Sequence, residues 1–163
     1  MSINGRSVKQ YDLQQMSITQ LHAQIRSDFH GYTLHPPRHK LRLVTEYVEW
    51  LLEGAKSTTV RYRPNAIDVP AALELPLIES VHDDNNNIEP NANNHQVGTV
   101  RITRIIIKPF GMLDDQDAHR DGFSTEHELK EALQRLYAPT YGHISDDQYV
   151  SIYTIHLVDR AMQ

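Results

Sequence analysis

Cysteine is missing from this sequence of 163 residues. Without it the chain can form neither a disulfide nor a thiolate metal site, and a cysteine nucleophile is excluded as well. Long apolar runs are also missing, since none approaches the ~18 residues that a membrane-spanning helix needs. The N-terminus lacks the apolar stretch of a secretory signal. We therefore expect a protein of the cytoplasm or the nucleus, without membrane contact and without a disulfide-linked partner.

Positive charge is the minority charge of this chain. The 16 lysines and arginines face 21 aspartates and glutamates, for a formal net charge of -5. Overall electrostatics therefore do not attract nucleic acid, and any contact with RNA or DNA must come from a local basic face. The hydrophobic content of 39% is ordinary for a globular protein, and the length suffices for one substantial core.

The first part of the chain predicts an arm that carries one helix. Apolar residues recur at helical spacing over residues 17–29, where Ser17 and Gln20 have the spacing of a capping box. Two consecutive prolines follow and exclude a continuing helix, because they lack amide donors and fix their own φ. This break predicts a boundary between an N-terminal helical arm at 1–38 and a main domain at 39–163.

The main domain predicts an α+β fold. Thr45 and Thr125 take the N-cap positions of two helices, Glu128 completes a second capping box, and Gly54 ends the first of these helices. Residues 81–96 are polar and rich in asparagine, which predicts a flexible loop. The predicted strands cover 40–45, 57–63, 71–80 (interrupted at Pro76), 97–110 and 148–158, and the helices 45–54, 114–122 and 125–137. Together they predict a small mixed β-barrel with flanking helices.

A short polar segment follows the first helix of this domain: "EGAKSTTVRYRP", residues 53–64. Side chains alternate in a regular strand, so the segment has two faces. One face holds Thr59, Arg61 and Arg63, and the other holds Thr58, Val60 and Tyr62. The second face has the character of core. The first carries a hydroxyl beside two guanidinium groups, which is typical either of a solvated strand or of the wall of a pocket.

Lys56 lies in the turn before this strand and can bring its amine toward the Thr59 hydroxyl. A threonine hydroxyl is a weak nucleophile until a neighbouring base takes its proton. A lysine serves as that base only if burial or nearby positive charge lowers its pKa. Arg61 supplies such a charge, and its guanidinium also suits an oxyanion or a phosphate. Composition alone does not distinguish this chemistry from a polar surface strand.

The octet "GAKSTTVR" resembles the G-x-K-x-x-T-x-R signature of the ASCH domain (activating signal cointegrator homology), a β-barrel relative of the PUA RNA-binding domains. The resemblance extends over residues 40–158 in the family's order. "LRLVTEYVEWLLEG" resembles its strand-and-helix lead-in, "LDDQDAHRDGFSTEHELKEALQRLY" its acidic turn and amphipathic helix, and "YVSIYTIHLV" its closing strand. The resemblance implies a PUA-like barrel.

Among enzymatic relatives, the chain resembles small N4-acetylcytidine amidohydrolases, which release cytidine and acetate. The resemblance implies that Lys56 is the base, Thr59 the nucleophile and Asp121 the proton donor, with Arg61 and Arg63 at the substrate and no cofactor. Asp121 stands where that family has a glutamate, and its side chain is shorter by roughly an ångström and a half. The loop at 81–96 and the arm at 1–38 have no counterpart in those compact enzymes.

Other functions remain open, because other ASCH relatives bind RNA without catalysis or act as ribonucleases. The partner is therefore a nucleoside or RNA. Arg101, Arg104 and Lys108 could form a stripe for an RNA backbone with "PRHKLR" at 37–42, or a solvated strand face. His35 and His39 are four residues apart, but the intervening prolines prevent convergence on a metal, so we expect no metal site. The acidic residues at 114–117 fit helix capping better than metal binding.

Overall fold

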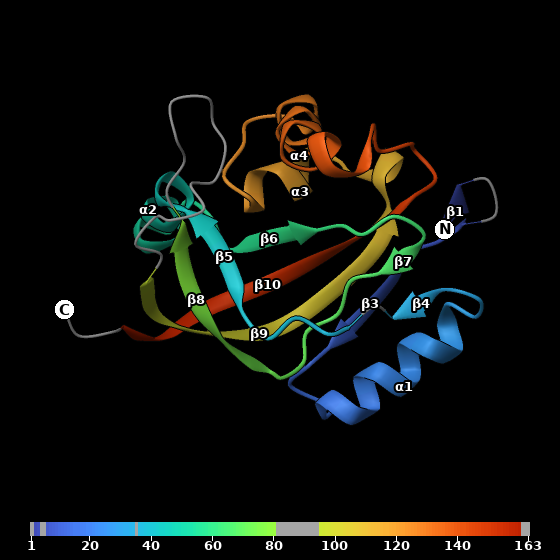
Figure 1. Ribbon diagram of the computed structural model, residues 1–163, viewed down its shortest axis with the longest axis horizontal. Helices are drawn as coiled ribbons and strands as arrows, with labels where there is room; N and C mark the ends of the chain where they lie inside the picture. The colour runs from blue at the N-terminus through green and yellow to red at the C-terminus, as the bar shows by residue number, and fades with distance from the viewer. Residues whose placement is uncertain (1, 4–5, 35, 81–94, 161–163) are drawn as a thin grey trace.

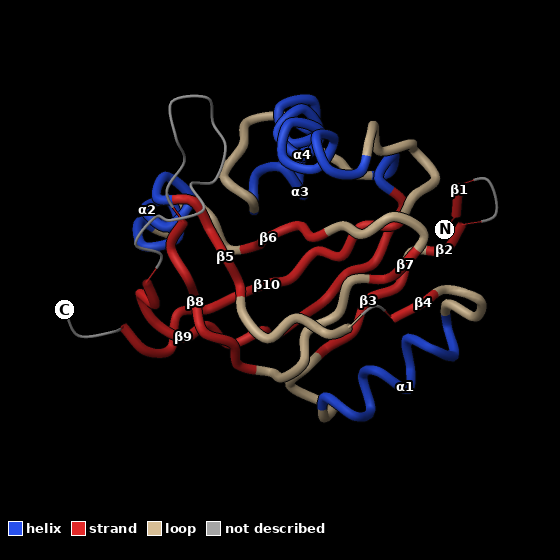
Figure 2. The backbone as a smooth tube through the Cα atoms, viewed as in Figure 1, coloured by secondary structure: helices blue, strands red, loops and turns tan. Residues whose placement is uncertain are grey.

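The computed structural model describes residues 2–3, 6–34, 36–80 and 95–160, and its main sheet curls into an open half-barrel (Figure 1). Helices lie outside this sheet, as the blue and red tubes in Figure 2 show. None of the described helices is long and apolar enough to cross a membrane. The strands are β1 Ser2–Ile3, β2 Arg6–Ser7, β3 Lys9–Asp12, β4 Thr33–Leu34, β5 Leu41–Val44, β6 Thr58–Arg61, β7 Ala66–Ile67, β8 Glu74–Ser80, β9 His95–Pro109 and β10 Tyr149–Arg160, and the helices are α1 Ile18–Asp28, α2 Thr45–Glu53, α3 Asp115–Arg120 and α4 Glu126–Tyr141, with a 3₁₀ turn at Phe110–Met112.

The predicted α+β class and mixed barrel are confirmed, and the barrel is open on one side. The strand order is β5-β8-β9-β10-β6. Strand β3 also pairs with β9, over residues 104–107, next to the stretch 95–101 that pairs with β8. Only β5 and β8 run parallel within this sheet of the described chain. Long strands such as β9 and β10 twist and coil, which bends the sheet on itself. The edge strands β5 and β6 thus approach each other without pairing, and the candidate site lies along this opening.

The helix predicted in the N-terminal segment is present as α1, with Ser17 as its N-cap and the complete capping box with Gln20. The described part of this segment shares the sheet and core of the remainder. Strand β3 pairs with β9, and Leu21 and Ile25 of α1 lie fully buried in the same apolar cluster as the inner side chains of the half-barrel. A division of the chain between residues 38 and 39 would therefore cut through this core.

The two predicted faces of β6 are confirmed by its pairing with β10. In that register Val60 lies opposite Ile152, and both belong to an outer apolar cluster that packs under α3 and α4. Thr59 lies opposite Tyr153, which belongs to the inner cluster of the half-barrel. Since side chains alternate, Arg61 shares the inner face with Thr59. The polar face of the strand therefore lines the concave side of the sheet.

Two predicted caps are wrong in detail. Thr45 is the first residue of α2 and not its cap, because Val44 takes that position without a side-chain hydrogen bond. Thr125 does cap α4, but the second half of its predicted box is absent. The Glu128 carboxylate accepts from the main chain of Ser124, one residue before the cap.

The sheet also differs from the prediction at one strand. Pro76 does not interrupt β8, which runs unbroken beside β9. The reason lies in the pairing: β5 joins β8 only from Leu77 onward, so at Pro76 the strand has a free edge where no donor is needed. Of the predicted loop at 81–96, residues 81–94 lie outside the described part of the chain, and His95 and Gln96 begin β9.

Ser17 and Thr45 give a matched test of helix capping, because Ser17 caps α1 and Thr45 caps no helix. We expect Ser17→Ala to lower the free energy of unfolding by about 1 kcal/mol, because it removes the hydroxyl that accepts from Gln20. Thr45→Ala removes an exposed hydroxyl that caps nothing and should leave stability within about 0.5 kcal/mol of the wild type. Urea unfolding followed by circular dichroism measures both, and equal losses would contradict the assignment of the caps.

Candidate active site

Lys56 and Asp121, which are far apart in sequence, form a buried ion pair. Lys56 lies in the turn between α2 and β6, where Gly54 adopts a left-handed conformation and the Lys56 main-chain N–H donates to Trp50 O at 3.1 Å. Asp121 is the C-cap of α3. The Lys56 Nζ lies 2.9 Å from Asp121 Oδ1, and the two side chains are only 2% and 6% exposed. The structure thus brings together the predicted base and the predicted acid.

Thr58 completes this contact, a role the sequence did not indicate. Its Oγ1 donates to Asp121 Oδ1 at 2.9 Å. The Lys56 Nζ also approaches the main-chain carbonyl of Asp121 at 3.5 Å, and the N–H of Ser57 donates to Arg120 O at 2.7 Å. These bonds tie the start of β6 to the end of α3. The only available signal was a hydroxyl on the otherwise apolar face of the strand, which is equally typical of a satisfied core threonine.

Burial dominates the titration of this pair. It lowers the pKa of Lys56 and raises the pKa of Asp121, although the attraction between the two charges opposes both shifts. The positive charge of Arg61 further lowers the pKa of Lys56, as expected from the sequence, and it also lowers the pKa of Asp121. The affinities of the amine and the carboxylate for a proton are therefore closer than in water. Such a pair is suited to moving a proton.

Arg61 spans the opening between the two edge strands. Its Nη2 donates to the main-chain carbonyl of Arg42 in β5 at 2.9 Å. The residue is 7% exposed, and its Nε is buried without an acceptor among the residues that the structure describes. Buried donors are nearly always satisfied, and a buried guanidinium favours an anionic partner. Thr59, 3% exposed, lies on the same face of β6, away from the Thr58–Asp121 contact.

Arg63 is held at a second buried carboxylate, that of Asp68. The Arg63 Nε lies 3.3 Å from Asp68 Oδ2, and Arg38 binds the same carboxylate through two nitrogens at 2.8 and 2.7 Å. The Tyr153 hydroxyl donates to the other oxygen, and burial together with Asp68 raises the pKa of Tyr153 well above its usual value. Ser151 Oγ donates to the main-chain carbonyl of Asp68 at 2.8 Å.

The sequence did not indicate Asp68 or Tyr153, and it indicated Arg38 only as one residue of the basic segment 37–42. One signal was present, since Asp68 is a single acid within the apolar stretch "AIDVPAA". A charge in such a stretch is buried and must find a partner. Its partners could not be named, because they lie 30 and 85 residues away in the chain.

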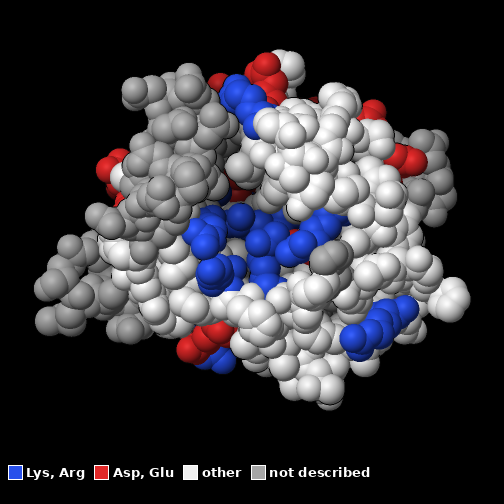
Figure 3. Space-filling model, in the orientation of Figure 1, with Lys and Arg blue, Asp and Glu red and all other residues white. Residues whose placement is uncertain are grey.

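Figure 3 shows lysine and arginine side chains gathered in a hollow, where Figure 1 places β5, β6 and β7. The contacts above assign four cations to this region: Arg38, Lys56, Arg61 and Arg63. Within the described chain Arg38 and Arg63 contact the Asp68 carboxylate and Lys56 contacts that of Asp121, while Arg61 pairs with neither of them. The region is therefore locally positive in a chain whose net charge is -5, and it attracts an anion.

The other candidate residues from the sequence do not belong to this site. Lys108 is buried against Asp117 at 2.7 Å, whereas Arg101 of β9 forms an exposed cross-strand pair with Glu74 of β8, so they do not form one basic stripe. Asp114 and Asp117 form a capping box at the start of α3, which confirms capping there. His35 lies outside the described residues, and no group of three potential ligands for a metal occurs within those residues.

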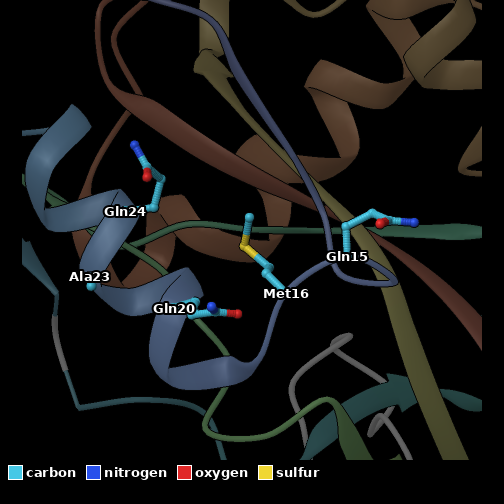
Figure 4. Close-up of a pocket in the computed structure, with 5 residues that line it drawn as sticks. All are labelled: Gln15, Met16, Gln20, Ala23 and Gln24. Carbon is cyan, nitrogen blue, oxygen red and sulfur yellow. The ribbon is translucent and has the colours of Figure 1, made fainter.

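A shallow depression elsewhere on the surface carries no such chemistry. Figure 4 shows it beside the first turns of α1, lined by Gln15, Met16, Gln20, Ala23 and Gln24. None of these side chains is ionisable. The hollow between β5 and β6 is therefore the better candidate for a site.

The chain forms an α+β half-barrel, and similarity to solved structures shows that its fold is ASCH-like. A crystal structure of an ASCH domain from Lactobacillus crispatus JV V101 matches with a TM-score of 0.51 and 11% identity, over 92% of this chain and 100% of that chain. A crystal structure of protein EF3133 from Enterococcus faecalis V583, of family DUF984, matches with a TM-score of 0.50 and 14% identity, over 88% and 94%. No protein-family model and no curated protein matches the sequence. The ASCH-like fold expected from the sequence is thereby confirmed.

Gly122 provides a test of how the site is held. Its φ is +97°, and a Cβ there would lie 2.6 Å from Trp50 Cε3. We expect Gly122→Ala to lower the free energy of unfolding by more than about 2 kcal/mol and to displace Asp121, because it adds a clash to the backbone strain. The fluorescence of Trp50, the one tryptophan of the chain, should shift in the folded state.

Gly31→Ala is the matched control for this substitution. Gly31 has a φ of +91°, but a Cβ there meets nothing within 4 Å. It carries backbone strain of about 1 kcal/mol without the clash. If the two variants lost equal stability in urea unfolding and both kept the native Trp50 spectrum, packing of Trp50 on Gly122 would not position the site.

Proposed function

We propose that this protein is a hydrolase that removes an acyl group from the exocyclic amine of a nucleobase, with N4-acetylcytidine as substrate and cytidine and acetate as products. The observation that carries the proposal is the buried contact of Lys56 with Asp121 at 2.9 Å, close to Arg61 and just before the start of β6, the strand that carries Thr59. This amine and this carboxyl group have opposite pKa shifts, as acid–base catalysis at neutral pH requires. The chemistry needs no cofactor.

In the proposed reaction, Thr59 Oγ1 attacks the acetyl carbonyl and its proton passes to neutral Lys56. The described residues show the Lys56 amine bonded to Asp121 and not to Thr59, so this step requires the amine to turn toward Thr59 when the substrate binds. The oxyanion that forms is stabilised by Arg61, whose Nε has a hydrogen to donate. Protonated Asp121 gives its proton to the exocyclic nitrogen as the carbon–nitrogen bond breaks, and cytidine leaves. Water then attacks the acetyl-Thr59 ester and gives one proton to Asp121, Lys56 returns its proton to the departing Thr59 oxygen, and acetic acid leaves and ionises to acetate.

The shorter acid is compatible with this scheme. Asp121 reaches Lys56 and Thr58 without the extra methylene of the glutamate in the enzymes that the sequence resembles. Asp121 caps α3, and α3 is anchored to β9 through Asp117 and Lys108. We propose that this anchoring places the backbone where the shorter side chain suffices, and that Thr58 orients the carboxyl group.

A noncatalytic RNA-binding module is the second candidate, and the basic hollow in Figure 3 favours it. The buried cations would then hold a backbone phosphate, and the Lys56–Asp121 pair would serve only to join α3 to the barrel. A ribonuclease would use the same hollow. Turnover of the acetylated nucleoside, or its absence together with binding or cleavage of RNA, separates these functions.

Incubation with N4-acetylcytidine and mass detection of cytidine tests the proposal. We expect Lys56→Ala and Thr59→Ala to lower kcat at least about a thousandfold, because each removes a group that acts in the transition state. Thr59→Ser keeps a hydroxyl and should restore most of the rate. Thr58→Ala removes a hydrogen bond to Asp121 and should cost less than about a hundredfold.

Trp50 fluorescence and circular dichroism show whether each variant is folded. A Thr59→Ala variant that is folded and retains most of its rate would exclude Thr59 as nucleophile. If Thr58→Ala abolished turnover instead, the nucleophile would be the hydroxyl that already contacts Asp121. Wild-type protein without turnover would leave the RNA-binding function.

The pH dependence of kcat/KM should reflect the two shifted groups. Activity should rise as Lys56 loses its proton and fall as Asp121 loses its own. Burial lowers the first pKa from 10.5 and raises the second from 3.8. Since the charge of Arg61 lowers both pKa values, Arg61→Met should move both limbs of the profile to higher pH and reduce kcat about a hundredfold through the lost oxyanion donor.

Arg101→Met is the control, because Arg101 lies in an exposed pair, and it should leave the profile in place. Limbs that do not move in Arg61→Met would contradict the assignment.

A further inference from the structure

Arg38 and Arg63 form a pair of guanidinium groups that a single carboxylate holds in place. Asp68, 3% exposed, accepts two bonds from Arg38 and one from Arg63. It is itself fixed by Tyr153 and, through its main chain, by Ser151. Both arginine side chains retain access to solvent, 19% for Arg38 and 27% for Arg63. They are therefore oriented in advance and reachable from the hollow.

Both arginines keep unused donors. Arg38 binds Asp68 through Nε and Nη2, and Arg63 through Nε alone. Within the described chain no hydrogen bond occupies Nη1 of Arg38 or either terminal nitrogen of Arg63. Arg61 adds its buried Nε to these free donors. A guanidinium fork is suited to a carboxylate or a phosphate because two N–H groups can donate to two oxygens at once.

The charge of this cluster matches a phosphate better than a carboxylate. Arg38, Arg61 and Arg63 bring three positive charges, and Asp68 brings one negative charge. Burial raises the pKa of Tyr153, and the positive charges of Arg38 and Arg61 both oppose that rise. Arg63 binds the same carboxylate as Arg38 and Tyr153, so the three cations lie in one electrostatic environment. A phosphate monoester carries about -1.5 to -2 charges at neutral pH. It would neutralise the excess, whereas a carboxylate would leave part of it.

The cluster also lies beside the proposed nucleophile. Tyr153, which binds Asp68, lies directly opposite Thr59 in the pairing of β10 with β6. Arg61 is two residues further along the same face of β6. A purely structural role for Asp68 would be met by Arg38 and Tyr153, which already occupy both of its oxygens. The second arginine is then in excess of what burial of the carboxylate requires.

We infer that Arg38 and Arg63 bind a phosphate group of the substrate, so that the acylated base is presented as part of a nucleotide or RNA and not as a free nucleoside. Only the identity of the base in this inference rests on the proposed function; the phosphate site does not. The phosphate is either the monoester of a nucleotide or a diester of an RNA strand.

Isothermal titration with the unacetylated products tests the phosphate site without requiring turnover. The wild-type protein should bind cytidine 5′-monophosphate at least about tenfold more tightly than cytidine, since charge-assisted hydrogen bonds contribute this much. Arg63→Ala should bring this ratio close to one, and Arg63→Lys should give an intermediate ratio because it keeps the charge and loses the fork. Inorganic phosphate should compete with the nucleotide.

Arg101→Ala is the matched control, because it removes an equal charge at an exposed pair with Glu74. It should preserve the ratio. Equal affinities for the nucleotide and the nucleoside in the wild type would overturn the inference, as would equal effects of Arg63→Ala and Arg101→Ala in folded protein. Arg63→Lys serves as the test if Arg63→Ala fails to fold: a wild-type ratio would then contradict the role of the fork.

A cytidine oligonucleotide with hydroxyl ends distinguishes the two sources of phosphate. Tighter binding of the oligonucleotide than of the monophosphate, lost in Arg63→Ala, supports a diester of RNA, and the reverse order supports a nucleotide. The proposed hydrolysis can fail separately. A nucleotide preference that depends on Arg63, without release of acetate from any acetylated substrate, would support the phosphate site and reject the hydrolase.

Discussion

The buried contact between Lys56 and Asp121 is the constraint on which this site depends. Taking an amine and a carboxyl group out of water is costly unless each finds a partner, and these two find each other at 2.9 Å. Thr58 and the main-chain bond from Ser57 to Arg120 hold the same junction. One short segment therefore fixes the approach of α3 to β6, and with it the acid, the strand face and the local charge. Structural and proposed catalytic demands coincide in this pair.

The open side of the half-barrel explains why charge collects there. Edge strands leave main-chain groups unpaired, and Arg61 satisfies one of them by donating to Arg42 O across the gap. A closed barrel would fill this space with apolar side chains. Here the concave face instead holds Asp68 and its arginines beside an apolar inner cluster. A hollow lined by oriented polar groups is suited to fixing a ligand in one orientation.

Local patterns predicted the elements well, because their causes are local. The helix at 17–29 and its capping box depend on residues within a few positions of each other, and so do the two faces of β6. Where the prediction was wrong at Pro76 and Thr45, the cause was the position of a neighbouring strand, β5, in the folded structure. Pro76 is accepted within β8 because β5 begins to pair one residue later. Thr45 gave way to Val44 as N-cap because strand β5 runs directly into α2, without an intervening turn.

For the site, the sequence by itself determined which chemistry was available: a lysine in a turn, a polar strand face with Thr59, Arg61 and Arg63, and an acid before a glycine. Asp121 was assigned to the site only by resemblance to a family, since no spacing rule connects residues 65 positions apart. The tertiary structure alone decided that Thr58 bonds to this acid and that Asp68 collects two arginines and a tyrosine. The physical reason is burial. A charge must find its partner wherever the fold places one, and chain distance does not enter that requirement.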